Sequence, residues 1–166
     1  MEIRFNSKSV DYSWLSNFSP HPVRDSRGRV WPTAEHMYQA CKSPIEAEQE
    51  LILQAKTPHE AKRLGRTITL REGWEEFKTE AMRRVLALKF RQHPDLEKQL
   101  VATHPARLIH EAPWDGFWGS GRDGRGLNRQ GELLEELREK LRPSLEELDR
   151  LILRSPHLPV VPGEDF

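Results

Sequence analysis

From Thr33 onward the sequence is a series of short amphipathic helical patterns, each bounded by a capping residue or a proline. The longest covers residues 72–92, with Trp74, Ala81 and Val85 at helical spacing and charges on the other face, which predicts the central packing helix. Short helices bury their apolar stripes against one another, so the pattern predicts a mostly helical core. The other expected helices are 33–43, 45–54, 57–65, 94–102, 129–141 and 144–154.

Strand patterns are few and lie mainly near the N-terminus. We expect a strand at 2–5, a hairpin in which 22–25 and 29–31 flank the turn 26–28, and one later strand at 107–111. The 166 residues therefore predict a compact, mostly helical α+β fold, with a small N-terminal β region and a single domain over 1–154. The Pro-rich tail 155–166 is expected to be extended.

The charge balance and the apolar pattern exclude several classes of protein. Lys plus Arg number 26 and Asp plus Glu number 26, so no extended nucleic-acid binding is expected. No apolar run approaches the ~20 residues of a spanning helix, and the N-terminus lacks a signal-peptide pattern, so neither membrane nor secretion is expected. Cys41 is the single cysteine, and His36 has no second histidine four residues later. We therefore expect no metal site and a cytoplasmic protein.

Two irregular segments have the composition of binding loops. Residues 12–18 mix aromatic and apolar side chains with turn residues, which predicts a buried loop that lines a site. Residues 113–131 hold six of the ten glycines and three aromatic residues, a composition typical of a ligand-binding segment. This segment lacks the Gly-Lys-Ser/Thr ending of a P-loop, so a nucleotide triphosphatase is not expected. Asn128 is a natural N-cap for the helix that follows.

One helical stripe has the residue types of a catalytic pair. Glu35 and Lys42 are seven residues apart, so on a helix they share one face, with Tyr38 or Gln39 between them. One interpretation is a solvent-facing stripe with weak ion pairing. The other is an active site, in which the helix dipole favours ionised Glu35 and desolvation lowers the pKa of Lys42, making it a nucleophile.

The order of several motifs resembles the NADAR family. The blocks are Trp31-Pro-Thr-Ala-Glu-His, Gln39-Ala-Cys-Lys42, Gly65-Arg66, Trp118-Gly119 and Gly126-Leu-Asn128-Arg-Gln-Gly131. The similarity runs from about Phe5 to Leu141, which is most of the chain. Ser120 stands where some members carry Asp, so no carboxylate is expected at that point.

The resemblance implies an N-glycosidase that needs no cofactor and has Glu35 and Lys42 as catalytic residues. Its substrates would be riboflavin-biosynthesis intermediates, cleaved between a ribose phosphate and the exocyclic amine of a pyrimidinone. The alternatives are an ADP-ribosyl hydrolase that removes ADP-ribose from guanine in nucleic acid, and a non-catalytic module that binds ADP-ribose or NAD. The residues expected to bind the small phosphorylated riboside or the ADP-ribosylated guanine are Asn17, Phe18, Arg66, Trp118, Gly119, Asn128 and Arg138. For Arg138 a salt-bridged position on its helix is the alternative.

Two mechanisms are compatible with these residues. In the preferred one, neutral Lys42 forms a Schiff base with the anomeric carbon while Glu35 shuttles protons to the leaving amine and the ring oxygen. In the other, Glu35 alone activates water and Lys42 binds the ligand.

Overall fold

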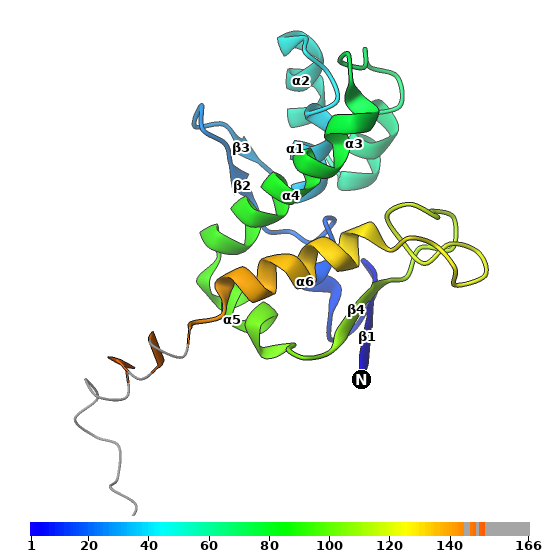
Figure 1. Cartoon of the computed structure of the whole chain (residues 1–166). Helices are drawn as coiled ribbons and strands as arrows, with labels where there is room; N and C mark the ends of the chain where they lie inside the picture. The colour runs from blue at the N-terminus through cyan, green and yellow to red at the C-terminus, as the bar shows by residue number, and fades with distance from the viewer. Residues whose placement is uncertain (145–146, 149, 152–166) are drawn as a thin grey trace, which may run out of the picture.

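The computed structural model describes residues 1–144, 147–148 and 150–151. Helix α4 (Trp74–Gln92) is its central element, as the sequence predicts, and other helices pack against it. These are α1 (Ala34–Ala40), α5 (Pro94–Ala102) and α6 (Arg129–Leu141), with α6 lying between α4 and strand β4 (Figure 1). The bounds of α5 and α6 are the predicted ones. Helix α4 begins later than expected, because Gly73 has a left-handed φ of 70°.

Two short helices complete one end of the molecule. Helices α2 (Glu46–Leu53) and α3 (Pro58–Leu64) pack against α1 and against each other (Figure 1). The predicted cap of α3 is present, since Thr57 Oγ1 accepts a hydrogen bond from Glu60 N, and Pro58 occupies the first turn. Trp31, Ile52 and Ala61 form a second apolar cluster between these helices. Helix α3 is thereby fixed beside α1, which positions one wall of the pocket described below.

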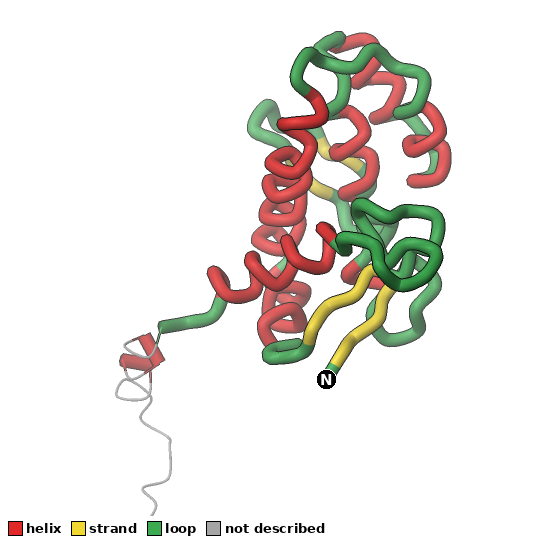
Figure 2. The backbone as a smooth tube through the Cα atoms, turned by 45° about the vertical axis from the view of Figure 1, so that its right-hand side comes forward, coloured by secondary structure: helices red, strands yellow, loops and turns green. Residues whose placement is uncertain are grey.

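The strands form two separate two-stranded sheets, and Figure 2 shows the strands as yellow parts of the tube. Strand β1 (Glu2–Phe5) pairs in parallel with β4 (Arg107–His110), with Phe5 opposite His110. Strands β2 (Val23–Arg24) and β3 (Val30–Trp31) form the predicted hairpin, although each is shorter than expected. The α+β prediction is confirmed. The partner of β1 comes from more than 100 residues along the chain, and no local pattern indicates that pairing.

Lys89 corrects one expectation about α4. The sequence pattern places charges on the exposed face of this helix, but the side chain of Lys89 is fully buried. Its Nζ donates hydrogen bonds to Trp14 O at 2.6 Å, Ser16 O at 2.8 Å and Ser19 Oγ at 2.7 Å. Three N–H groups thus meet three acceptors, which is what makes a buried ammonium tolerable. Lys89 therefore anchors the loop 14–19, which overlaps the 3₁₀ turn Ser13–Leu15. This loop is largely buried, as predicted.

The C-terminal part is described only in part. Ser144 and Glu147 exchange hydrogen bonds between side chain and backbone N–H, which is the capping box of the predicted final helix. Residues 145–146, 149 and 152–154 of that helix, and the whole of the tail 155–166, lie outside the described residues. Within the described part, no helix is both long and apolar enough to cross a membrane.

Candidate active site

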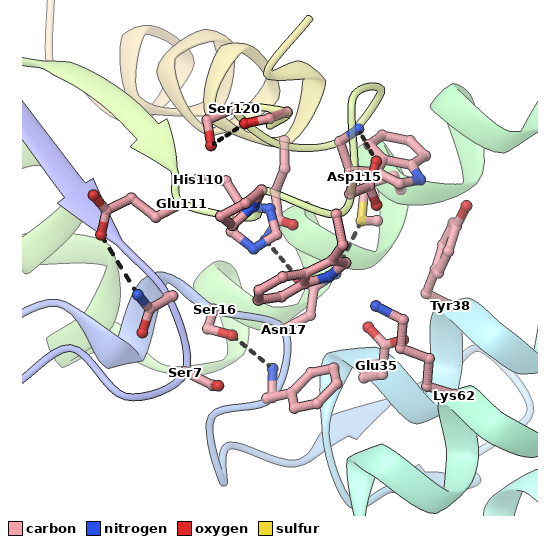
Figure 3. A pocket seen from close by; sticks show the side chains of 18 of the residues that line it. Ser7, Ser16, Asn17, Glu35, Tyr38, Lys62, His110, Glu111, Asp115 and Ser120 are labelled. Carbon is pink, nitrogen blue, oxygen red and sulfur yellow. Dashed lines mark hydrogen bonds between the residues drawn. The ribbon is translucent and has the colours of Figure 1, made fainter. Parts of the chain in front are cut away.

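A single large pocket brings the predicted catalytic pair together. It encloses about 1050 Å³ and opens between two walls, α1 with α3 on one side and the end of β4 with the following glycine-rich loop on the other. Figure 3 shows Glu35, Tyr38 and Lys62 on the first side and His110 and Asp115 opposite them. Both Glu35 and Lys42 line this pocket, so the solvent-facing stripe is not what the structure shows.

Glu35 is held in place by its neighbours on three sides. It lies in the first turn of α1, where Thr33 Oγ1 caps the helix by accepting from His36 N. Its own backbone N–H donates to Asn17 O at 3.0 Å, and its Oε1 accepts from Gln39 Nε2 at 2.7 Å. The side chain is buried, and this burial raises the pKa of the Glu35 carboxyl against the lowering effects of Gln39, Lys62 and Lys42. The direction is opposite to the expected preference for ionised Glu35, because desolvation outweighs the groups that favour the charged form, and it favours the protonated acid.

Helix α1 ends at Ala40 rather than near Ser43 as expected, so Lys42 lies in the turn that follows it, and its pKa has the opposite shift. Burial lowers its pKa first, and the nearby cations Lys62 and Arg66 lower it further, while Glu35 acts in the other direction. Its Nζ donates a long hydrogen bond of 3.4 Å to Gly65 O and lies 6.0 Å from the centre of the Tyr38 ring. A lowered pKa increases the fraction of neutral amine, which is the nucleophilic form.

Helix α3 adds positive charge to the same wall. Lys62 and Arg66 both line the pocket, and no ion pair joins either of them to a described carboxylate within 4.0 Å. Lys62 Nζ lies 5.8 Å from the centre of the Phe18 ring, which also makes an edge contact with His59. These uncompensated charges, close to a pair that would act on a sugar, are suited to bind a phosphate group.

The opposite wall combines a histidine, a carboxylate and an indole. His110 stacks on Phe5 with 5.3 Å between ring centres, and burial lowers its pKa, so the ring is neutral at pH 7. Asp115 Oδ1 accepts from the backbone N–H groups of Phe117 and Trp118, which fixes the start of the glycine-rich loop. Trp118 contacts the Tyr38 ring edge-on across the pocket, with 5.7 Å between centres. Aromatic surface here is available to stack on a planar base.

Six of the nine predicted site residues line the pocket: Glu35, Lys42, Asn17, Phe18, Arg66 and Trp118. The structure does not bring the other three to it. A Cβ at Gly119 would lie 2.6 Å from Ala112 Cβ, so this glycine permits close packing of the loop against the end of β4. Arg138 is buried elsewhere and donates to Thr103 Oγ1 and Ala106 O, with Glu139 as a charged neighbour.

Asn128 has a structural role that differs from the expected one. It stands at the N-cap position of α6 with a left-handed φ of 52°, but its side chain makes no capping hydrogen bond. Instead, Oδ1 accepts from His110 N and Nδ2 donates to Leu108 O. The side chain therefore joins the loop to the free edge of β4, and the expectation of a side-chain cap is wrong.

Sequence reasoning missed several pocket residues. His59 and Lys62 are three residues apart on α3, so their helical spacing was a signal that they share a face, and the predicted binding residue Arg66 follows one turn later. Asp115 stands before Gly116 in a position typical of an Asx turn, and it supplies a pocket carboxylate although Ser120 replaces the family's Asp. His110 had no local signal, because its place depends on the pairing of β4 with β1.

The described residues contain no group of three or more His, Cys, Asp or Glu side chains that could hold a metal ion. His36 has structural partners for both ring nitrogens, Thr33 Oγ1 at 2.8 Å and Ala55 O at 3.0 Å. Cys41 is partly buried against the core, as expected, and burial raises the pKa of its thiol. The ionisable groups in the described pocket that burial shifts towards their neutral forms include Glu35, Lys42 and His110.

Fold and site together define a small α+β enzyme whose pocket sets a buried carboxylic acid beside a desolvated amine. Comparisons with known proteins agree with that class. The family model described as the NADAR domain matches residues 4–142, so the chain belongs to the NADAR family. It is 44% identical over 141 residues to the Escherichia coli protein named N-glycosidase YbiA, covering 84% of this chain and 88% of that protein.

Two further comparisons extend this result. The solved NMR structure of E. coli YbiA matches with a TM-score of 0.78 and 40% identity, covering 95% of this chain and 94% of the other. The maize protein named riboflavin biosynthesis protein PYRR, chloroplastic, is 41% identical over 144 residues, covering 76% of this chain and 23% of that longer protein. The fold of the chain is thus the one that an N-glycosidase of the family adopts.

Proposed function

We propose that this protein is an N-glycosidase that hydrolyses the bond between a ribose phosphate and the exocyclic amine of a pyrimidinone. The names of its relatives support the reaction class and the connection to riboflavin biosynthesis. The observation that carries the proposal is the pair Glu35 and Lys42. Both line one pocket, and their pKa values are shifted in opposite directions, towards the protonated acid for Glu35 and towards the neutral amine for Lys42.

The reaction begins with opening of the sugar ring. Glu35 donates a proton to the ring oxygen while the nitrogen lone pair forms an iminium bond to the anomeric carbon. The neutral amine of Lys42 adds to that carbon, a proton passes to the original nitrogen, and the pyrimidinone leaves as its free amine. Water then adds to the lysine Schiff base and releases ribose phosphate. One water is consumed, and Glu35 and Lys42 return to their starting protonation states.

The remaining pocket residues position the substrate. Lys62 on α3 and Arg66 just after it would hold the phosphate, because their charges are not compensated by ion pairs within the described chain. Trp118 and Phe18 supply aromatic surface for the pyrimidinone ring. Asn17 is held by Gln130 Nε2, which donates to its Oδ1, so its backbone carbonyl is fixed against Glu35 N.

Reduction with borohydride tests the lysine route. In the presence of substrate, reduction of the Schiff base should leave the sugar phosphate attached to Lys42, and Lys42→Ala should give no adduct. Turnover by the wild-type protein without any adduct would instead support direct attack by water activated by Glu35, with Lys42 as a binding residue.

A second candidate substrate is ADP-ribosylated guanine in nucleic acid. The pocket volume of about 1050 Å³ favours it, since this is at the upper end of the usual range for small-ligand sites. Trp114 and Arg122 also line the mouth of the pocket, where a larger substrate would extend. The balanced net charge argues against binding of a long duplex, but binding a single displaced base needs little electrostatic attraction.

A panel assay decides between these substrates. Release of sugar phosphate or ADP-ribose is followed with both substrates, beside Glu35→Gln and Lys42→Ala. Cleavage of the ribosylaminopyrimidine alone supports the proposed substrate, and cleavage of ADP-ribosylated guanine alone supports the second. If neither is cleaved while ADP-ribose or NAD binds, the protein is a binding module and the proposed function is wrong. Because the net charge is balanced, the small-molecule ribosylaminopyrimidine is the substrate to assay first with the purified protein.

A further inference from the structure

Gln39 fills a slot between Glu35 and the end of α3. Its side chain is buried, and its Nε2 donates to Glu35 Oε1 at 2.7 Å. Its Oε1 has no hydrogen-bond partner among the described residues. A buried carbonyl oxygen without a partner is unfavourable, so no hydrogen bond of Oε1 explains the position of the amide. The amide is held by the hydrogen bond from Nε2 to Glu35 and by the shape of the slot.

Gly65 forms the far side of that slot. Its φ of −60° is ordinary for any residue, so the backbone does not require glycine here. The observed position of the Gln39 amide leaves no room for a side chain here, because a Cβ would lie 1.9 Å from Gln39 Oε1 and 2.7 Å from Gln39 Cδ. The carbonyl of the same residue accepts the hydrogen bond from Lys42 Nζ. The C-terminal end of α3 therefore contacts the support of Glu35 and the amine of Lys42 at one point.

We propose that Gln39 is a positioning residue that fixes the orientation of the Glu35 carboxyl, and that Gly65 is glycine because it must admit the Gln39 amide. The proposal rests on the proposed function, in which Glu35 is the proton donor. It assigns a functional reason to a glycine that neither the backbone angle nor a turn explains.

The electrostatic consequence can be derived from the groups around Glu35. The Gln39 hydrogen bond lowers the pKa of this carboxyl, as do Lys62 on α3 and Lys42 at the end of α1, whereas burial and Asp115 on the facing loop raise it. Loss of the Gln39 contact therefore raises the pKa of Glu35 further. Because a general acid must be protonated, the basic limb of the kcat profile then moves to higher pH, while kcat itself falls through misorientation.

The first variant is Gly65→Ala, which replaces neither catalytic side chain and keeps the backbone carbonyl that accepts from Lys42 Nζ. The new methyl group displaces the Gln39 amide, since the end of a flexible side chain is what it meets. We expect kcat to fall by about 10- to 100-fold with a smaller change in KM, and the melting temperature to stay the same or rise, because alanine is favoured over glycine in a helical conformation. Gly116→Ala is the matched control, since a Cβ there meets nothing within 4 Å, and it should behave as wild type.

A double-mutant cycle separates this role from general packing. Gln39→Ala should reproduce the loss in kcat and the pH shift. In the Gln39→Ala background, Gly65→Ala should have no further effect, because the side chain that it displaces is gone. Additive losses, or a Gly65→Ala protein with wild-type kcat and pH profile, would overturn the proposal.

Titration of Glu35 by carboxyl ¹³C NMR needs no substrate and tests the inference apart from the reaction. An upward shift in both single variants supports it. An unchanged Glu35 titration overturns it, whatever the panel assay shows. Failure of the wild-type protein to cleave either substrate would instead contradict the proposed function, and the titration would still report on the contact between Gln39 and Glu35.

Discussion

Lys42 is partly buried and Lys89 is fully buried; desolvation lowers the pKa of both, yet they lie in regions of opposite character. Lys89 is sealed beneath the 14–19 loop, where each of its three N–H groups has an acceptor within 2.8 Å. Lys42 lines an open pocket that Glu35 lines as well, and it makes a long hydrogen bond to Gly65 O. The loop over Lys89 supplies acceptors for an ammonium group, whereas the pocket leaves the amine of Lys42 accessible.

The difference shows that desolvation by itself does not make a nucleophile. Burial lowers the pKa of Lys89 to about 7, but the loop surrounds its amine and leaves no space for a ligand. The charged form of Lys89 also donates all three hydrogen bonds, which opposes the loss of its proton. A reactive lysine needs a lowered pKa together with an open approach and a proton donor, and only Lys42 of these two has them.

The largest expected effect is a loss of activity, and it distinguishes the Lys42 region from the Lys89 region. Lys42→Arg keeps a positive charge but removes the nucleophile, so turnover of the phosphorylated riboside should fall by at least about 10³-fold. The free energy of unfolding should change by less than about 1 kcal/mol, because the side chain lies at the pocket surface. Single-turnover kinetics and urea unfolding measure these two quantities. Lys98→Arg, on the exposed face of α5, is the control. Near-wild-type turnover by Lys42→Arg would show that Lys42 is not the nucleophile and does not differ from Lys89 in this respect.

The next effect is on stability. Lys89→Met should lower the free energy of unfolding by about 2–4 kcal/mol near pH 6, because the carbonyls of Trp14 and Ser16 lose their donor in the interior. In the protein that remains folded, borohydride should still trap the sugar on Lys42. Absence of that adduct in folded Lys89→Met would mean that Lys89 takes part in the chemistry.

The pH dependence of stability sharpens the contrast. The pKa of Lys89 is about 7 in the folded protein and has its ordinary value of 10.5 in the unfolded chain. Between these values the unfolded state binds a proton that the folded state does not, so stability of the wild type relative to Lys89→Met should rise with pH, by up to about 1.4 kcal/mol per pKa unit of difference. Urea unfolding of both proteins at intervals from pH 6 to 9 measures it. A constant difference would show that the three hydrogen bonds keep Lys89 charged.

The smallest effect is that of a single acceptor. Ser19→Ala removes one of the three acceptors of Lys89 and should lower the free energy of unfolding by about 1 kcal/mol. In the Lys89→Met background the same change should cost less, since the hydroxyl no longer has an ammonium to bind. Ser26→Ala, at an exposed turn position, serves as the control for loss of a hydroxyl group. Equal costs in both backgrounds would show that Ser19 does not help to anchor Lys89.

Local signals predicted most of the secondary structure. Helices α5 and α6 have the predicted bounds. The signals are the proline at the start of α5 and the apolar stripe of α6, and such signals act over only a few residues. The same local reasoning failed at Lys89, since a helical charge pattern does not show which loop will cover it. It also failed at Asn128, whose amide groups bond to β4 rather than to the N-terminal turn of α6.

The candidate site divides in the same way. Helical spacing was enough to select Glu35 and Lys42, and composition was enough to select Asn17, Phe18 and Trp118 as pocket residues. The facing wall with His110 and Asp115 could not be found, because it depends on how a distant loop folds back.

The sequence by itself determined where most helices lie, the caps of α1 and α3, and the hairpin, because hydrogen-bonding periodicity and capping act within a turn or two of helix. Tertiary structure alone decided that β1 pairs with β4, that Lys89 is buried, and that Gly65 meets Gln39. It also decided the opposite pKa shifts of Glu35 and Lys42. Such shifts arise from desolvation and from charges on other segments, and these depend on which parts of the chain meet in space.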